Sequence, residues 1–354
     1  MTHKYRAKLG MAALAGLLLA GQAAVSPAAA ATPGAQAPAA SAVAYSELSI
    51  LPGGTTNRSF GINLNGQVAG DSGTASGKIR AVLWNEAGEP TDLGTLPGDD
   101  SSTAFSVNNT DTAVIGRSIG TVERAVRWDH NRRITELPGR PGAATTRAYH
   151  VNDSRVTVGF SITADGNWHA MRWGADARPT ELPALPGDPS AGATWINNLG
   201  VSVGASSTAE GRNRAVRWGA DGRVTELPAL PGHGDSAVTA VNDAGVMVGG
   251  SSVTASSPTK AVVWTRGGAV RELPTFPGDT GSYALALAEN GVAVGYSVTP
   301  AGKHRPVVWK TDGTVHALPF GGPGAGDAYA VQNGVAVGVV TESGAPSRAG
   351  VWRR

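Results

Sequence analysis

One segment of about 45 residues recurs along most of this chain, and such an internal period restricts the fold to repeat architectures. The segment is clearest from Glu181 to Thr225. Each copy carries a tryptophan, and successive tryptophans stand 44, 45, 45, 46, 45 and 43 residues apart. Seven copies of this marker are present: Trp84, Trp128, Trp173, Trp218, Trp264, Trp309 and Trp352.

Each copy predicts four short strands. In the copy that begins at Glu181, strand-forming runs fall at 193–197, 201–206, 214–218 and 223–230. Asn-Asn-Leu-Gly, a polar loop and Ala-Asp-Gly separate these runs, and such residues favour turns. No copy shows helical periodicity, and four strands in a repeat of this length are typical of a propeller blade. The sequence therefore predicts an all-β, seven-bladed β-propeller with four-stranded antiparallel blades.

The two ends of the repeat region predict how the ring closes. The last copy stops at Arg354 and lacks its fourth strand, whereas a spare strand, Tyr45–Gly53, precedes the first copy. If the spare strand completes the last blade, the ring has no open sheet edge. We therefore expect the N-terminal strand to close the ring and to place Leu48 near Val351.

The N-terminal segment carries the pattern of a secretory signal peptide over residues 1–31. Basic residues at positions 4–8 precede an apolar run, Leu9–Ala20, that is shorter than the ~20 residues of a membrane span. Small residues follow, with cleavage expected near Ala30 or Ala31. Residues 32–44 are rich in Ala and Pro and predict a linker, which leaves 45–354 for the propeller. We expect a secreted, extracellular protein whose mature part has no membrane span.

Charge and cysteine content narrow the function classes. The chain has 29 Lys and Arg against 27 Asp and Glu, and removal of Lys4, Arg6 and Lys8 with the signal leaves 26 against 27. A near-neutral domain argues against general nucleic-acid binding. With no cysteine, the fold must be held by its core alone. We expect a monomer that uses neither a cofactor nor a metal.

Three repeated residue types have structural interpretations. The tryptophans predict packing between blades, and a glycine after an apolar residue, such as Gly204, predicts room for a large neighbour. An asparagine at the end of the first strand, such as Asn197, predicts a turn held by local hydrogen bonds. Arginine and glutamate nine residues apart predict ion pairs across the last hairpin, at Arg127 and Glu136, Arg172 and Glu181, and Arg217 and Glu226.

One repeated position is basic or potentially basic in all seven copies, and it opens the third strand. Loops between second and third strands emerge on one face of a propeller, so these side chains predict a binding face for an anionic polymer. The alternative is that nearby acidic residues, such as Asp99 and Asp188, pair with them locally. The candidate ligand-binding residues are Arg80, Arg124, Trp168, His169, Arg212, Arg214, Lys260, Lys303, His304, Arg305 and Arg348.

Two tryptophans lie outside the repeat register. Trp168 follows Asp165-Gly166-Asn167 and is expected in a polar loop on the basic face. An exposed indole there could act as a platform for a sugar ring, and the alternative is a half-buried loop anchor. Trp195 falls within a first strand and is expected in the core between blades.

The runs around the third strand resemble a known family. Arg-Ala-Val-Leu-Trp at 80–84, Arg-Ala-Val-Arg-Trp at 124–128 and Asp-Leu-Gly-Thr-Leu-Pro-Gly at 92–98 are similar to the motifs of HAF-type extracellular repeat proteins. The resemblance covers about residues 46–354, although Arg or Lys replaces the family's His in most copies. It implies secretion and a propeller-like fold in a bacterial repeat family, and it brings no catalytic residues.

Two functions follow from these observations. The first is a secreted, non-catalytic propeller that binds a cell-wall glycan, an anionic polymer or a protein partner through one loop face. The second is an extracellular hydrolase or lyase at the channel mouth, for which His169, His233 and His304 are the available acid–base residues. These histidines belong to different copies, so we assign no catalytic residue.

Overall fold

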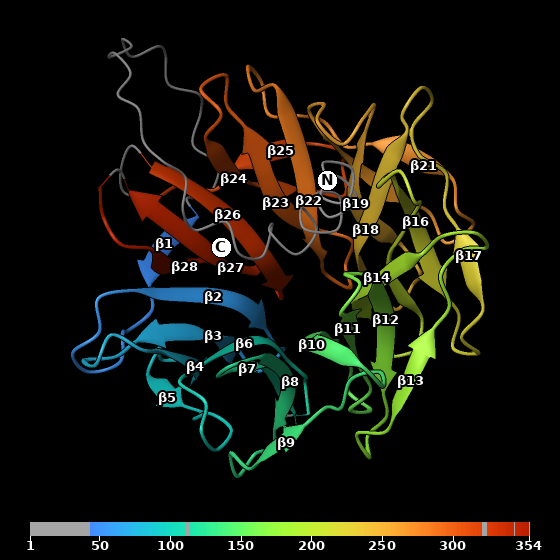
Figure 1. Ribbon diagram of the computed structural model, residues 1–354. Helices are drawn as coiled ribbons and strands as arrows, with labels where there is room; N and C mark the ends of the chain where they lie inside the picture. The colour runs from blue at the N-terminus through green and yellow to red at the C-terminus, as the bar shows by residue number, and fades with distance from the viewer. Residues whose placement is uncertain (1–42, 111–112, 321–323, 343, 354) are drawn as a thin grey trace, which may run out of the picture.

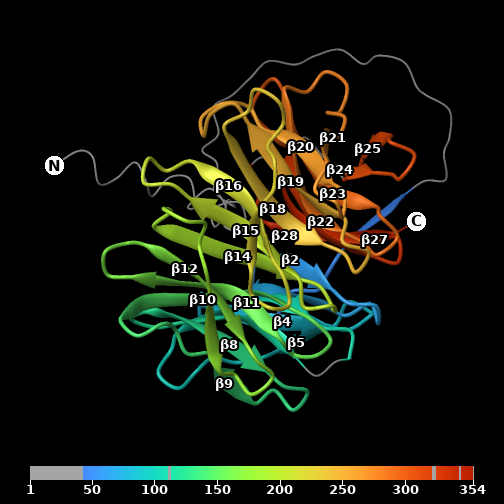
Figure 2. The ribbon, with the colours of Figure 1, turned by 90° about the vertical axis from the view of Figure 1, so that its right-hand side faces the viewer.

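Seven four-stranded antiparallel sheets form a ring of blades in the computed structural model (Figure 1). The structure describes residues 43–110, 113–320, 324–342 and 344–353. Seen from the side, the blades follow one another in chain order from blue to red (Figure 2). The predicted seven-bladed all-β propeller is therefore confirmed. The expected signal peptide and nearly all of the expected linker lie outside the described residues.

In six blades the strands run from the central axis to the rim in chain order, and in the last blade the N-terminal strand takes the outermost place. The innermost strands are β2 (Asn57–Ile62), β6 (Ser101–Val107), β10 (Ala143–Val151), β14 (Ser190–Ile196), β18 (Asp235–Val241), β22 (Gly281–Leu287) and β26 (Gly324–Gln332). The second strands are β3 (Val68–Gly73), β7 (Val114–Ile119), β11 (Thr157–Thr163), β15 (Ser202–Ser207), β19 (Met247–Ser252), β23 (Ala293–Val298) and β27 (Val335–Glu342). The third strands are β4 (Ile79–Trp84), β8 (Glu123–Trp128), β12 (Trp168–Trp173), β16 (Asn213–Trp218), β20 (Lys260–Trp264), β24 (His304–Trp309) and β28 (Arg348–Arg353).

The outermost strands are the shortest, and a Leu-Pro pair stands at the end of five of the seven. They are β5 (Pro90–Asp92), β9 (Ile134–Glu136), β13 (Pro179–Leu182), β17 (Val224–Glu226), β21 (Val270–Glu272), β25 (Val315–Ala317) and β1 (Ala44–Glu47). In blade 4 the amide of Leu227 still donates to the carbonyl of Ala215 at 2.8 Å. Pro228 has no amide hydrogen to continue the ladder, so the strand expected at 223–230 ends early.

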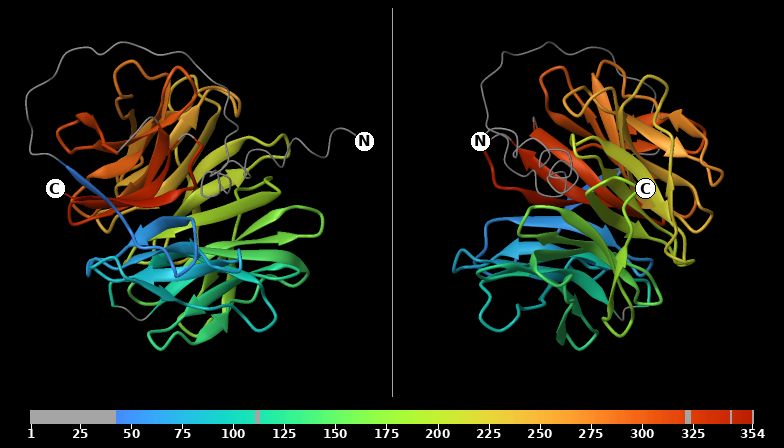
Figure 3. Two further views of the ribbon diagram at one scale, coloured as in Figure 1. Left: turned by 90° about the vertical axis from the view of Figure 1, so that its left-hand side faces the viewer. Right: turned by 45° about the vertical axis from the view of Figure 1, so that its right-hand side comes forward.

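The N-terminal strand closes the ring. β1 pairs antiparallel with β28, with Tyr45 opposite Trp352 and Glu47 opposite Gly350. Figure 3 shows the blue strand beside the red C-terminal strands. Leu48 is buried in one cluster with Val82 of blade 1 and with Val351 of blade 7, as expected. The paired segment is shorter than the expected Tyr45–Gly53, since the chain turns away after Leu48 to enter β2.

The repeated tryptophans bind neighbouring blades together. All seven are at most 1 % exposed. In six of them the indole Nε1–H donates to a backbone carbonyl in the segment that leads into their own blade, as Trp218 does to Pro183 at 2.7 Å. Trp128 packs with Leu93 and Leu96, which follow the outermost strand of the preceding blade. The expected role in packing between blades is confirmed.

The repeated glycine allows the innermost strand to bulge. A Cβ placed on Gly204 would lie 2.0 Å from the carbonyl oxygen of Gly192, and the other six glycines meet a carbonyl at 1.9–2.0 Å. A Cβ on Gly70 would also lie 2.7 Å from the ring of Trp84. Room for a large neighbour, which the sequence predicted, is therefore a weaker reason for glycine than the contact with the backbone carbonyl. Beside each glycine the first strand shifts register, between Ala193 and Trp195 in blade 4. The bulge turns one extra side chain per blade toward the axis.

Candidate functional site

The basic column on the second-to-third loop face pairs with carboxylates. Arg124 and Arg214 reach Asp99 and Asp188 at 2.7 Å, and Arg305 reaches Asp279 at 3.1 Å. The remaining pairs are Lys260 with Glu272, Arg348 with Glu47, and His169 with Glu181. Arg80 instead donates to the hydroxyl of Thr95 at 3.1 Å. The local pairs weighed as the alternative thus form at six positions, and binding of an anionic polymer at this face stays a prediction.

Three further candidates on this face have different surroundings. Arg212 donates to the carbonyl of Gly234 at 3.0 Å. Lys303 is exposed in the turn directly before β24. His304 places Nδ1 2.7 Å from Asp327 Oδ1 and stacks on Tyr296 at a centroid distance of 3.9 Å. The structure spreads the candidate residues over all seven blades and does not gather them around one pocket.

Trp168 is not the exposed loop indole that the sequence suggested. It is the first residue of β12 and is 9 % exposed. Its ring lies 4.1 Å from that of Phe160, in the core around the channel. Its side chain is too deeply buried to offer a platform for a sugar ring.

The arginine–glutamate pairs expected nine residues apart do not form. The register of β8 and β9 places Glu136 opposite Val126, so Arg127 and Glu136 point to opposite faces of the blade. Glu136 pairs with Arg124 instead. Arg127 crosses to the next blade and donates to the carbonyl of Ala175 at 2.7 Å. Arg172 and Arg217 likewise donate to carbonyls of the following blade, those of Ala220 and Arg266.

The bulged residues form a ring inside the channel, and this ring is the floor of a pocket. Its members are Phe60, Phe105, Tyr149, Thr194, Thr239, Leu285 and Tyr329. The aromatic members contact one another, with Phe60 5.5 Å from both Phe105 and Tyr329. On the side of the ring away from the pocket, the guanidinium of Arg58 stacks on Phe60 and that of Arg117 stacks on Phe105. Arg58 forms an ion pair with Asp71, and Arg117 forms one with Glu123.

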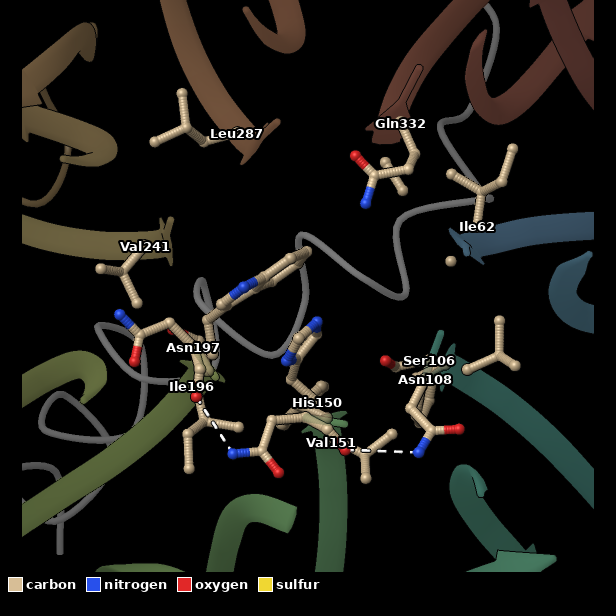
Figure 4. Close-up of a pocket in the computed structure, with 18 of the residues that line it drawn as sticks. Ile62, Ser106, Asn108, His150, Val151, Ile196, Asn197, Val241, Leu287 and Gln332 are labelled. Atoms are coloured by element: carbon tan, nitrogen blue, oxygen red, sulfur yellow. Dashed lines mark hydrogen bonds between the residues drawn. The ribbon is translucent and has the colours of Figure 1, made fainter. Parts of the chain in front are cut away.

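The next position along each innermost strand makes the pocket asymmetric. Five blades place a small residue there, and two adjacent blades place His150 and Trp195. The two rings stack at a centroid distance of 3.7 Å with an interplanar angle of 18°. In Figure 4 the imidazole of His150 points toward the centre of the ring of strand ends. The small residues are Gly61, Ser106, Ala240, Ala286 and Ala330.

Trp195 therefore differs from its expected place between two blades. It is only partly buried and packs against apolar clusters of blades 5, 6 and 7 as well as on His150. The two rings lie in the wall of a cavity of about 130 Å³, which residues of all seven blades line, Ser106 and Ala330 among them.

Side-chain amide hydrogen bonds link neighbouring blades at the mouth of this pocket. Asn152 donates to the carbonyl of Asn197 at 3.0 Å, and Asn197 donates to that of Asn242 at 3.0 Å (Figure 4 shows the first of these bonds). The Oδ1 atom of Asn197 also accepts from the amide of Val201, which is the local turn bond expected from sequence. These bonds fix consecutive blades to one another at the mouth.

Three carboxylates stand around the mouth, where Asp153 and Asp243 follow a repeated asparagine and Glu289 follows Ala288 at the same repeat position. Asp153 and Asp243 each accept two hydrogen bonds from an asparagine of the preceding blade, and Glu289 accepts one from the amide of Asp243. Partial burial, and then the charges of Asp243 and Asp153, raise the pKa of Glu289. Among the described residues, no Lys or Arg forms an ion pair with any of the three, and none lines the pocket.

His150 is neutral at ordinary pH. Burial lowers its pKa to about 3, and the backbone of Ile196 raises it only in part. Its Nδ1 atom is buried and has no hydrogen-bond partner among the residues that the structure describes. The pocket is thus aromatic and neutral inside and acidic at its rim.

Comparisons with known proteins show the fold alone. No family model matches the chain, and no curated protein matches it. A solved oligogalacturonate lyase in complex with manganese is similar at 13 % identity, with a TM-score of 0.58 over 88 % of this chain and 96 % of that one. A streptogramin B lyase structure matches at 14 % identity and a TM-score of 0.51, covering 88 % of this chain and 97 % of that one.

The propeller domain of the Trilobed protease from Pyrococcus furiosus, described as having an open velcro topology, matches at 9 % identity. Its TM-score is 0.54, over 84 % of this chain and 93 % of that one. In the present chain the corresponding seam is closed by β1 on β28.

No three His, Asp or Glu side chains within the part of the chain that the structure describes lie close enough together to hold a metal ion. None of the segments placed by the structure is a helix with the length and apolar character needed to cross a lipid bilayer.

Proposed function

We propose that this protein is a non-catalytic binding module whose ligand enters the central pocket at the mouth ringed by asparagines. The observation that supports this most is the departure of His150 and Trp195 from the repeat. A structural propeller needs only small residues at this position, as five blades show. Two stacked rings instead line one side of a cavity of about 130 Å³ at this mouth. Concave sites of this kind, apolar with a few polar groups, are typical of ligand pockets.

The cavity limits the size of what it can hold. An apolar cavity of about 150 Å³ accommodates one benzene-sized ring. The ligand is therefore a small molecule, or one side group of a larger molecule, rather than a polymer lying flat on the face. A cell-wall or protein partner would present such a group to the pocket.

We also propose that the chain is exported and belongs to the HAF-type extracellular repeat proteins. The motifs at 80–84 and 92–98 and the pattern of residues 1–31 support this. N-terminal sequencing of the protein recovered from culture medium should begin near Thr32. A chain that keeps Met1 and stays with the cells would contradict it.

A second candidate function, a hydrolase or lyase, rests on His304 at the opposite mouth. Its Nδ1 lies 2.7 Å from Asp327, and Tyr329 donates to the second oxygen of that carboxylate at 3.1 Å. A carboxylate that orients an imidazole is one part of a general base. Turnover of ester or glycoside substrates that disappears in His304→Gln would favour this function over simple binding.

Binding in the pocket can be tested with one-ring probes. We suggest phenethylamine, phenethyl alcohol, 3-phenylpropionate and N-acetylglucosamine, each titrated to about 10 mM. Tryptophan fluorescence reports on the pocket, because Trp195 is partly exposed whereas the seven repeated tryptophans are buried. We expect at least one probe to bind with a Kd of about 1 mM or below.

Two variants distinguish the pocket from the basic face. Ser106→Leu adds a large side chain to the lining of the cavity, and we expect it to abolish binding. Arg214→Ala removes one basic column residue on the opposite face, and we expect it to leave binding unchanged. If no probe binds, or if Ser106→Leu binds as well as the natural protein, the proposed site is wrong.

A further inference from the structure

We infer that the ligand of the central pocket is an organic cation, an amine carried on an apolar or aromatic body. The inference rests on the proposed function and adds the charge of the ligand. It joins two independent features of the same cavity, an aromatic floor and an acidic rim.

The floor is suited to an apolar body. Four of the seven bulged residues are aromatic, and their rings contact one another as a continuous surface. His150 and Trp195 form a wall above this floor, and the imidazole carries no charge that would repel a cation. On the other side of the floor, Arg58 pairs with Asp71, while Arg117 and Arg147 share Glu123, so two carboxylates face three arginines there.

The rim selects the charge. Asp153, Asp243 and Glu289 border the same cavity from three blades. Their hydrogen bonds come from amides, which orient the carboxylates without neutralising them. Like charges held around one opening repel each other and create a negative potential at the mouth. An ammonium group at the rim would relieve that repulsion, whereas a carboxylate would increase it.

The geometry also orders the two parts of the ligand. The floor lies deep in the channel, at the bulges, and the carboxylates follow the strand ends at the mouth. An amine with a short spacer would therefore place its apolar part inside and its ammonium at the rim. A neutral aromatic compound lacks the contact with the carboxylates at the rim.

Comparing three of the probes tests this inference. Phenethylamine, phenethyl alcohol and 3-phenylpropionate share one ring and differ in charge. We expect the amine to bind about tenfold tighter than the alcohol, and the acid to bind more weakly than both. Added salt should weaken the binding of the amine and leave the binding of the alcohol unchanged, because salt screens charges at a solvent-exposed rim over about 10 Å.

Isosteric variants identify the carboxylates responsible. The triple variant Asp153→Asn, Asp243→Asn, Glu289→Gln keeps hydrogen-bond acceptors, and we expect it to lose about tenfold in amine affinity without a change for the alcohol. The matched control Asp129→Asn, Asp176→Asn, Asp221→Asn removes three charges from outer turns and should change neither. If the triple variant fails to fold, Glu289→Gln alone can replace it, because Glu289 is exposed. We expect a smaller loss of amine affinity from this single variant.

The outcomes separate this inference from the proposed function. Equal binding of the amine and the alcohol, or an unaffected triple variant, would overturn the cation while leaving the pocket as a binding site. Failure of every probe to bind would overturn both.

Discussion

Closure of the ring by β1 makes a prediction that can be worked out from one leucine. Leu48 is 6 % exposed and packs between blades 1 and 7, against Val82 and Val351. Leu227 occupies the same repeat position between blades 4 and 5 and is 3 % exposed. Replacing a buried leucine by alanine costs about 2–5 kcal/mol, from lost burial and from the cavity left behind.

The two leucines differ only in how their segment is attached. Leu227 belongs to an uninterrupted chain, whereas Leu48 is held in place by the pairing of β1 with β28. If β1 is docked, Leu48→Ala and Leu227→Ala should lower the free energy of unfolding by similar amounts, about 2–4 kcal/mol. Urea unfolding followed by tryptophan fluorescence measures both, and an unchanged slope would show that the same structure unfolds.

Glu47→Ala is the control on the seam itself. Its only ion pair among the described residues is with Arg348 at 3.6 Å, and an exposed pair contributes about 0–1 kcal/mol. The closed ring would be refuted if Leu227→Ala were destabilised while Leu48→Ala remained as stable as Glu47→Ala.

Three further predictions concern the scaffold around the pocket. Gly204→Ala should cost about 3 kcal/mol, because its Cβ would meet the Gly192 carbonyl at 2.0 Å, and Gly267→Ala, with only Thr265 nearby at 3.8 Å, should be near neutral in the same urea assay. Asn197→Ala should cost about 1–3 kcal/mol, since it leaves the Val201 amide without its acceptor and removes one of the two hydrogen bonds to the Asn242 carbonyl, and a midpoint unchanged from the natural protein would contradict these bonds. For His150, whose pKa falls from 6.5 to about 3 on burial, the unfolded chain binds a proton that the folded chain does not between these values, so its contribution to stability is lost as pH drops through that range. His150→Gln should therefore lose less stability than the natural protein between pH 6.5 and 3, and parallel pH curves would show that His150 is not buried as described.

The fold was predictable because the period carries it. A tryptophan every 43 to 46 residues, with a Leu-Pro turn before each blade, leaves few architectures open, and the unfinished last copy indicates where the ring closes. The extent of the outer strands was less predictable. Strand-forming residues continue past Glu226 in the sequence, but Pro228 ends the ladder through a missing donor rather than through its hydropathy.

The pocket could not be predicted from charge, because the repeated basic residues lie on the opposite face of the propeller. The partners of Arg124 and Arg214 lie 25 to 26 residues away in sequence, and their pairing depends on the loop geometry. The nine-residue ladder failed for a related reason, since register decides which face a side chain occupies.

One sequence signal could have located the pocket. His150 and Trp195 stand 45 residues apart, at a repeat position where the other copies carry Gly, Ser or Ala. Two bulky residues in adjacent copies at a position otherwise reserved for small ones indicate a local departure from the scaffold. The bulge that turns this position toward the axis could not be inferred, because it depends on a close backbone contact at the glycine.

The most direct test of the central pocket is a crystal structure of the full chain soaked with phenethylamine. We predict density for the ring beside His150 and Trp195, above Phe60 and Phe105, with the ammonium directed to Asp243 and Glu289. An empty channel, with the amine bound only among the carboxylates of the opposite face, would contradict the account.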